Sequence, residues 1–482
     1  MSSRRDRRDR TATPRRAIVV AAVLLVAAIG FVVAALNATP PAERAARPTA
    51  RAITPLLSAR RVPEVVRADV AGARLQAAVA PVVQGAPSSC LAVDGPTGRL
   101  VSIDADTPLA PASTQKLLTA TAALATYGPD YRYRTTVVAT ASPRNGAVDR
   151  LWLVGSGDPV LSTPAYQARL ANQALTRHDV TTPLAALADA VVASGVRSVP
   201  GGIQGDDHLF DASRTLPVWP PRYVTDGEIG PLGALTVDDG FVPPNGAPAP
   251  DPALEAASQL RDLLVARGVA VGPAGHANAP ARTVTVGAVS SPPLHDVIAS
   301  MLTSSDNLTA ELLTRLLGTT RAVPGTTQAG LDVATAKLRA LRLPTTGLTL
   351  VDGSGLSRDD RATCNLLLAT LERSSDARYR AVSDGLPVAA QSGTLADRLH
   401  GTVLAGRLAA KTGSLDGVTG LVGSLALRAP LQFAFLANGS FPESVGVALR
   451  ERLATTLATY PDAPPATALV PAPASPAEPT RR

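Results

Sequence analysis

The chain has 482 residues, of which 45% are hydrophobic, and its formal net charge is +7. This length and apolar content allow about two to four domains with a sizeable core, and they exclude a wholly disordered chain. Residues 1–16 contain seven arginines and two aspartates, so all other residues together carry only +2, which argues against nucleic-acid binding.

The first predicted element is residues 17–36, a run of 20 apolar residues without a charge. A helix of this length spans a bilayer, and the arginines before it favour a cytoplasmic N-terminus. We therefore expect a cytoplasmic basic tail at 1–16, a single-pass transmembrane signal anchor at 17–36 and an extracytoplasmic remainder. Small residues around 34–38 keep a cleaved signal peptide open as the alternative, which would make the protein secreted.

Two segments rich in proline and alanine border the folded part. Residues 37–62 also contain several arginines and lack a hydrophobic period, so they predict a linker. Residues 461–482 have a similar composition and predict a disordered tail.

Strand patterns occur near both ends of the folded part. A helical pattern begins at Pro63, and residues 88–104 contain two β-type runs around a Gly/Pro turn, which predicts a hairpin. Three further strands are predicted near the other end, followed by an amphipathic helix at 442–460; the strands are 406–415, 417–428 and 430–439. We expect strands from both ends to share one antiparallel sheet that helices cover.

Residues 133–288 have a different texture, with short strands and many Gly, Pro and Asp turns. This texture predicts an inserted, mainly β, domain. Its cluster Trp219-Pro220-Pro221 is interpreted as a turn and packing feature. Cys90 and Cys364, the only cysteines, could form a disulfide in an exported protein or remain two buried thiols.

The first chemical motif is Ser113-Thr-Gln-Lys116, at the start of a helical pattern that ends at Gly128. Residues three apart lie on one helical face, and a helix N-terminus supplies N–H groups and positive dipole near the serine. A serine beside a desolvated lysine can act as a nucleophile without a histidine. Taken alone the motif is weak, because ordinary capping explains most such pairs.

The second motif is Ser305-Asp306-Asn307, before an apolar-periodic helix. By itself it is adequately explained as an N-cap formed by Ser305 or Asp306.

The third motif is Lys411-Thr412-Gly413-Ser414, within a predicted strand. In a flat strand Lys411 and Gly413 face one way and Thr412 and Ser414 the other, so a joint role requires twist or a bulge. The glycine allows a ligand to approach, and hydroxyls beside an ammonium suit a substrate carboxylate. The alternative interpretation is a strand that simply ends in a turn.

Lysine scarcity connects these motifs. Only three of the 46 basic residues are lysines, and two of the three, Lys116 and Lys411, occupy the motifs. An ammonium can be shifted to a low pKa by burial, whereas a guanidinium stays charged. The order Ser-x-x-Lys, Ser-x-Asn, Lys-Thr-Gly is the signature of serine penicillin-recognising enzymes.

The sequence resembles the D-alanyl-D-alanine carboxypeptidase/endopeptidase branch of the class C low-molecular-mass penicillin-binding proteins. Further matching stretches are 154–162, 351–361 and 386–399, and the long interval between the first two motifs also fits this branch. The resemblance implies an α+β fold: a serine β-lactamase/transpeptidase-like domain with an antiparallel five-stranded sheet covered by helices, at 63–132 and 289–460, with the inserted domain at 133–288. The insertion is shorter than in the best-known members, and Ser414 stands where the family often has threonine.

The resemblance also implies a mechanism on peptidoglycan stem peptides. Ser113 attacks the bond between the terminal D-alanines, Lys116 accepts its proton, and β-lactams acylate the same serine. Ser305 and Lys411 relay the proton and Asn307 orients the substrate. Thr412, Gly413 and Ser414 form the carboxylate-binding strand. The same acyl-enzyme also permits endopeptidase cleavage of cross-links.

Other activities are less compatible with the sequence. A Gly-x-Ser-x-Gly elbow is absent from the sequence, and its five histidines lack zinc-type spacing, so we expect no metal and no cofactor. A β-lactamase, or a non-catalytic module that binds peptidoglycan or senses β-lactams, remains as the alternative.

Overall fold

A computed structural model describes residues 22–30, 32–33, 63–243, 246–320 and 322–465. The chain divides into two units, residues 1–61 and 62–482, and the predicted motifs all lie in the second. The predicted basic tail, linker and most of the C-terminal tail, 466–482, lie outside the described residues.

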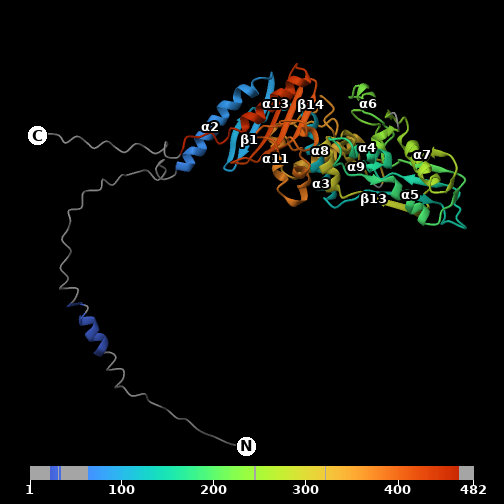
Figure 1. Cartoon of the computed structure of the whole chain (residues 1–482), viewed down its shortest axis with the longest axis horizontal. Coiled ribbons are helices and arrows are strands. Elements are labelled where there is room, and N and C mark those ends of the chain that lie inside the picture. Colours follow the sequence, from blue (N-terminus) through green and yellow to red (C-terminus); the bar gives the residue numbers. More distant parts are fainter. Residues whose placement is uncertain (1–21, 31, 34–62, 244–245, 321, 466–482) are drawn as a thin grey trace, which may run out of the picture. The chain divides into compact units, whose positions relative to one another are not determined.

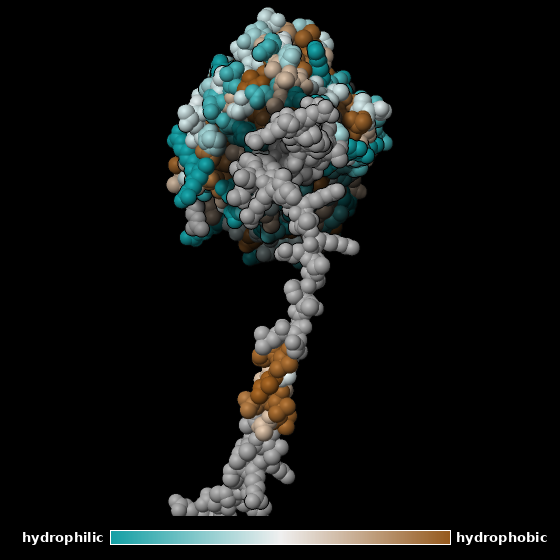
Figure 2. Space-filling view, turned by 90° about the vertical axis from the view of Figure 1, so that its left-hand side faces the viewer, coloured by the Kyte–Doolittle hydropathy of each residue, from teal (hydrophilic) through white to brown (hydrophobic). Residues whose placement is uncertain are grey.

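The described part of the first unit is helical at 22–30 and 32–33 and exposes apolar side chains, which Figure 2 shows in brown. Val23, Leu24 and Leu25 are each more than 60% exposed. Among the described residues, the helices are all too short or too polar to cross a bilayer. The remainder of the predicted anchor, 17–21, 31 and 34–36, is outside the described residues.

The second unit contains an antiparallel five-stranded sheet whose strand order is β14-β15-β16-β1-β2. Its strands are β1 (Ser88–Gly95), β2 (Gly98–Ile103), β14 (Leu408–Leu415), β15 (Val418–Leu425) and β16 (Leu431–Asn438). The expectation that strands from both ends share one sheet is confirmed, because β1 pairs with β16 in continuous register. The edge strand β14 carries the Lys-Thr-Gly motif.

Helices cover both faces of this sheet, so the successive residues 90–93 of β1 are all buried. Leu91 and Val93 pack in the core beneath α2 (Pro63–Val83) and α13 (Glu443–Leu457), and Cys90 and Ala92 pack in the core on the other face. The helices of that second core are α3 (Lys116–Tyr127), α8 (Leu294–Ser304), α9 (Asn307–Leu317), α10 (Thr327–Ala340), α11 (Cys364–Arg373) and α12 (Ala381–Asp384). Figure 1 shows α2 and α13 beside each other next to the sheet.

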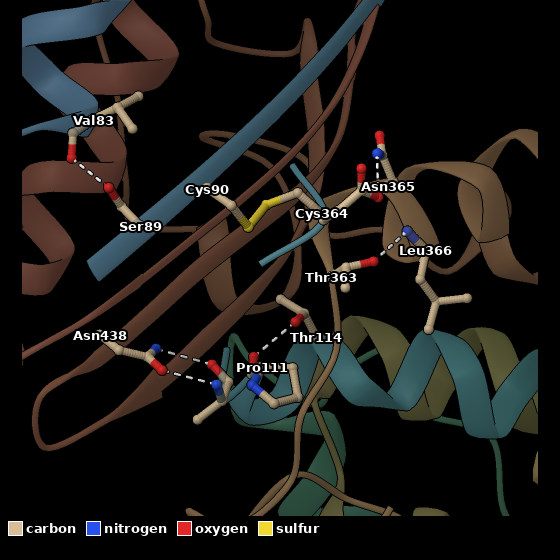
Figure 3. The surroundings of a disulfide bond; sticks show 12 residues. Val83, Ser89, Cys90, Pro111, Thr114, Thr363, Cys364, Asn365, Leu366 and Asn438 are labelled. Carbon is tan, nitrogen blue, oxygen red and sulfur yellow. Dashed lines mark hydrogen bonds between the residues drawn. A yellow bond between two sulfur atoms is a disulfide. The ribbon is translucent and has the colours of Figure 1, made fainter. Parts of the chain in front are cut away.

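A disulfide joins the two layers on that second face. Cys90 in β1 is bonded to Cys364, the first residue of α11 (Figure 3). Both cysteines are fully buried. Of the two interpretations left open by the sequence, the structure therefore has the disulfide.

The segment predicted as an insertion contains a second five-stranded sheet with its own core. Its order is β12-β8-β4-β3-β13, with strands β3 (Arg134–Ala139), β4 (Leu151–Val154), β8 (Ile203–Asp206), β12 (Ala274–His276) and β13 (Val284–Ser290). The sheet is mixed: β12, β8 and β4 run parallel, whereas β4, β3 and β13 are antiparallel. Helices α5 (Leu184–Ala193) and α7 (Pro252–Val265) pack on it, so this segment has more helix than a mainly β description conveys.

Short elements complete the second unit. They are β5 (Leu161–Ser162), α4 (Pro164–Ala171), β6 (Thr182–Pro183), β7 (Ser198–Val199), α6 (Arg222–Thr225), η2 (Asp238–Gly240), β9 (Phe241–Val242), β10 (Ala247–Pro248), β11 (Ala270–Val271), η3 (Ala377–Tyr379) and η4 (Gly393–Leu395).

Candidate active site

Ser113 lies in a short 3₁₀ turn, η1 (Ala112–Gln115), directly before α3. Ala112 has a φ of 46°, in the left-handed region that a non-glycine residue seldom adopts. The turn is held from the end of β16, where Asn438 accepts from the backbone N–H of Ala110 at 2.8 Å and donates to its carbonyl at 3.1 Å (Figure 3). Strain of this kind persists only where the surroundings fix the backbone, which is typical of functional sites.

Two glycines allow other segments to approach this turn. A Cβ on Gly413 would lie 2.7 Å from the carbonyl oxygen of Pro111, and one on Gly355 would lie 2.0 Å from that of Ala112. Gly355 also has a φ of 83°, which disfavours any side chain. Gly413 was predicted to let a ligand lie against the strand. In the structure it is the turn before Ser113 that lies against Gly413.

Lys116 is fully buried at the first position of α3 and makes three hydrogen bonds through its ammonium group. Nζ lies 2.8 Å from Ser113 Oγ, 2.7 Å from Asn307 Oδ1 and 2.8 Å from the carbonyl oxygen of Ser354. Because the i to i+3 spacing is local, the sequence predicted the first of these contacts. The second joins motifs 191 residues apart.

Burial determines the protonation of Lys116. Desolvation lowers its pKa to about 8, although nearby carboxylates, Asp306 and Asp352 first among them, oppose this shift. A substantial fraction of Lys116 is therefore neutral at mildly alkaline pH and can accept a proton from Ser113.

The segment Ser305–Asn307 connects α8 to α9. Ser305 ends α8 with a left-handed φ of 64°, and Asp306 caps α9 by accepting from the N–H groups of Leu308 and Thr309. Asp306, not Ser305, is thus the N-cap. This backbone conformation directs the Ser305 side chain to Lys411 and the Asn307 side chain to Lys116.

Asn307 connects the lysine to the inserted segment. Its Oδ1 accepts from Lys116, and its Nδ2 donates to the carbonyl of Glu228 at 2.7 Å. Both polar atoms of this side chain are therefore engaged within the protein, and a role in orienting substrate requires exchange of the Glu228 contact.

Lys411 is the second buried ammonium. Its Nζ donates to Ser305 Oγ at 2.8 Å and to the carbonyl of Thr412 at 3.0 Å. Burial lowers its pKa well below the usual value, and repulsion from Lys116 and Arg450 adds to the decrease. Burial therefore makes each of the two ammonium groups easier to deprotonate than an exposed lysine.

Thr412 and Ser414 were expected to face away from Lys411, and the position of β14 at the edge of the sheet bears on how all three can serve one site. The Ala410 N–H donates to Pro387 outside the sheet, so the N–H groups of Thr412 and Ser414, two and four residues later, point to the same open side. Pairing of β14 with β15 is continuous, so of the two alternatives, twist or a bulge, the bulge is absent from this strand pair. Among the described strands none pairs with this edge of β14, where only Val388 bridges to Ala409, and Thr412 and Ser414 line the cavity.

The two hydroxyls of this strand have different partners. Thr412 Oγ1 lies 2.8 Å from Thr394 Oγ1, which belongs to η4. Ser414 Oγ accepts from Arg450 Nη1 at 2.7 Å, and the same nitrogen donates to the Gly413 carbonyl at 3.1 Å.

A buried loop, residues 351–357, places the Ser354 carbonyl against Lys116. The Asp352 carboxylate accepts from the N–H groups of Gly355 and Ser357 and from Trp219 Nε1, at 2.6–2.8 Å. Glu311 Oε1 accepts from the N–H groups of Gly353 and Ser354, at 2.9 and 2.7 Å. Trp219 is therefore not only a packing residue, since it attaches the inserted segment to the loop behind the lysine.

The carboxylates behind Lys116 are themselves shifted. Burial, followed by repulsion from Asp352, raises the pKa of Glu311 to about 8 and that of Asp360 to about 9. The raised pKa of Glu311 favours its neutral form, which opposes deprotonation of Lys116 less than a carboxylate does.

Ser113, Asn307, Ser305, Thr412 and Ser414 all line one cavity of about 630 Å³. The cavity continues between α8 and the inserted segment 159–181, and Arg450 also lines it. A cavity of this size accommodates a ligand as large as a short peptide.

The structure brings all the predicted catalytic residues into two hydrogen-bonded groups around the segment 305–307. The functional contacts that the motifs did not indicate are those of Ser354, Glu228, Thr394 and Arg450. Only the stretches 351–361 and 386–399, which resembled the family, gave a signal for Ser354 and Thr394. Within the described part of the chain, acidic, histidine and cysteine side chains form no group of three or more that could hold a metal.

The chain is similar to one protein family and to two carboxypeptidases. The model of the D-Ala-D-Ala carboxypeptidase 3 (S13) family matches residues 75–251 and 246–460. A carboxypeptidase of Mycobacterium tuberculosis is 35% identical over 365 residues, covering 73% of this chain and 76% of that protein. A D-alanyl-D-alanine carboxypeptidase of Actinomadura is 31% identical, covering 79% of this chain and 82% of that protein.

Among solved structures, penicillin binding protein 4 of Haemophilus influenzae has a similar fold. The TM-score is 0.65 at 20% identity, and the alignment covers 78% of this chain and 97% of that one. The expected α+β architecture is thereby confirmed.

Proposed function

The chain belongs to the D-Ala-D-Ala carboxypeptidase 3 (S13) family and is a serine-type D-Ala-D-Ala carboxypeptidase, and we propose that Ser113 is its nucleophile and Lys116 its general base. One observation carries this assignment: Lys116 Nζ lies 2.8 Å from Ser113 Oγ at a fully buried position. A desolvated lysine at this distance can accept the serine proton during attack.

The substrate is the D-Ala-D-Ala end of a peptidoglycan stem peptide. Ser113 Oγ bonds to the carbonyl carbon of the penultimate D-alanine while its proton passes to Lys116. The N–H groups of Ser113 and Ser414 stabilise the oxyanion, and the loss of one such donor costs about 2.7–4 kcal/mol in a serine protease.

Collapse of the tetrahedral intermediate breaks the peptide C–N bond. The proton that left Ser113 ends on the amine of the departing D-alanine, through Ser305 and Lys411, which are 2.8 Å apart. Water then hydrolyses the acyl-enzyme, which returns Ser113 and releases the shortened peptide. Thr412 and Ser414, beside Lys411, hold the terminal carboxylate. Gly413 lets their strand lie against the serine turn.

Penicillins mimic the same substrate end and acylate Ser113. The experiment is labelling of the full-length protein in detergent with a fluorescent penicillin. We expect stable labelling that is lost in Ser113→Ala and retained in Ser375→Ala, an exposed serine that serves as a matched control. Labelling that survives Ser113→Ala contradicts the assignment.

Two product assays separate the alternative functions. Release of D-alanine from a pentapeptide supports the carboxypeptidase, whereas rapid penicillin turnover indicates a β-lactamase. Labelling without D-alanine release indicates a binding or sensing module. Cleavage of a cross-linked muropeptide dimer measures the endopeptidase activity that the same acyl-enzyme permits.

We also propose that residues 17–36 anchor the enzyme in the membrane with residues 62–482 on the extracytoplasmic side. The support is the length of the apolar run, the seven arginines before it and the exposed apolar side chains of 22–26. Mass spectrometry of the membrane and secreted fractions tests this, since a mature N-terminus near residue 38 indicates cleavage instead.

A further inference from the structure

Arg450 is a buried cation that reaches the cavity from behind the sheet. It belongs to α13, is 6% exposed, and lines the same cavity as Ser113, Thr412 and Ser414. Through Nη1 it donates to the hydroxyl of Ser414 and to the carbonyl of Gly413. Both of these hydrogen bonds therefore reach β14, the strand that carries the proposed carboxylate-binding residues.

The charge of Arg450 is not neutralised by an ion pair within the described residues. The adjacent acid, Glu451, pairs with Arg398 at 3.6 Å instead. Burial lowers the pKa of Arg450 to about 10, so the guanidinium remains charged at neutral pH. The carboxylates of Glu443 and Glu451 act on this charge without an ion pair to it, so an anionic ligand in the cavity can supply the direct partner that the buried guanidinium lacks.

The hydrogen bond to Ser414 also orients its hydroxyl proton. A serine hydroxyl has one proton and two acceptor lone pairs. Because Arg450 donates to one lone pair, the O–H dipole points its proton away from the guanidinium. Ser414 lines the cavity, so this proton is available to an acceptor within it.

We propose that Arg450 is a positioning residue that makes the enzyme selective for peptides ending in a free carboxylate. It acts through Ser414, by orienting the hydroxyl toward the carboxylate, and adds its own positive charge to this side of the cavity. This proposal rests on the proposed function, because it concerns the terminal carboxylate of the same substrate. A role limited to attaching α13 to β14 is the structural alternative.

The two roles differ in their dependence on substrate charge. The test compares a stem pentapeptide with a free C-terminal carboxylate and the same peptide with a C-terminal amide, using Arg450→Gln, Arg450→Lys and wild type. We expect Arg450→Gln to lower kcat/KM for the carboxylate peptide by about tenfold, mainly through KM, with little change for the amide. Arg450→Lys should recover part of the preference, because it keeps the charge but not the geometry of the guanidinium.

Arg452→Gln is the matched control, since Arg452 is exposed two residues further along the same helix. It should behave like wild type. Equal losses on both peptides in Arg450→Gln, or an unchanged preference, overturn the proposal in favour of the structural role. Should Arg450→Gln fail to fold, Arg450→Lys carries the test, and a wild-type preference in it is the contradicting result.

Saturating fluorescent penicillin separates this proposal from the proposed function. Wild type that is never labelled contradicts the assignment of Ser113, whatever the peptide preference. Wild type that is labelled, together with a variant that is labelled but keeps its preference for the carboxylate, contradicts only the role of Arg450.

Discussion

Lys116 and Lys411 hold the two ends of one three-residue segment. Lys116 donates to Asn307, and Lys411 donates to Ser305. Both ammonium groups are fully buried, and each has a lowered pKa. The segment therefore joins two ammonium groups that lose their protons more readily than an exposed lysine, which an arginine could not do.

Acylation by a β-lactam should accelerate as the pH rises. The active form of Lys116 is neutral, and burial lowers its pKa to about 8, so the fraction able to accept a proton increases between pH 6 and 9. The second-order rate of fluorescent-penicillin labelling, measured at constant ionic strength, should rise with a midpoint near pH 8. A rate that is constant or falls over this range argues against Lys116 as the base.

Lys411→Arg should impair D-alanine release although it preserves a positive charge. A guanidinium is larger than the buried ammonium and cannot reproduce its contacts to Ser305 and Thr412. We expect kcat to fall by about a hundredfold, within the range for lost proton transfer. Lys337→Arg, at the third lysine, controls for the exchange itself. If Lys411→Arg releases D-alanine at the wild-type rate, the argument that position 411 requires a lysine is wrong.

Gly355→Ala should disturb the serine turn. The new Cβ would meet the Ala112 carbonyl at 2.0 Å, and the φ of 83° adds backbone strain. We expect a free energy of unfolding lower by about 1–3 kcal/mol and slower acylation. Gly401→Ala isolates the strain, because its φ is 70° but nothing lies within 4 Å of its Cβ. Equal effects in the two variants mean that the contact with Ala112 is unimportant.

Removal of the disulfide should reduce stability without abolishing activity at low temperature. The double variant Cys90→Ala/Cys364→Ala loses a covalent link between β1 and α11, which are 274 residues apart. Such losses typically cost about 2–4 kcal/mol, so the thermal midpoint should fall measurably. A reducing agent should lower the midpoint of wild type and leave that of the variant unchanged. An identical midpoint in wild type and variant contradicts a stabilising role.

Local spacing explains why part of the site could be predicted. Ser113 and Lys116 are three residues apart at the start of a helix, so the sequence contains this pattern directly. The order of the motifs and the resemblance to a family predicted that distant segments meet. The strand patterns predicted that strands from both ends of the chain share one sheet, but not that β1 pairs with β16.

Contacts between segments that lack a motif could not be predicted. Arg450 resembles any charged residue of an amphipathic helix, and its approach to Ser414 depends on how α13 packs behind β14. The contact of Asn307 with Glu228 depends on a carbonyl group, which every residue has. Alternation also placed Thr412 and Ser414 opposite Lys411, and only the edge position of β14 shows how they reach one cavity.

The attachments of the inserted segment to Asp352, through Trp219, and to Asn307, through Glu228, limit how this enzyme could be shortened. A minimal protein that kept only the residues around the first sheet would retain every signature motif. It would also lose the hydrogen bonds from Trp219 to Asp352 and from Asn307 to the Glu228 carbonyl, which fix residues around Lys116. A shortened enzyme would therefore need new groups in place of this indole and this carbonyl, because the motifs alone do not hold the lysine in its surroundings.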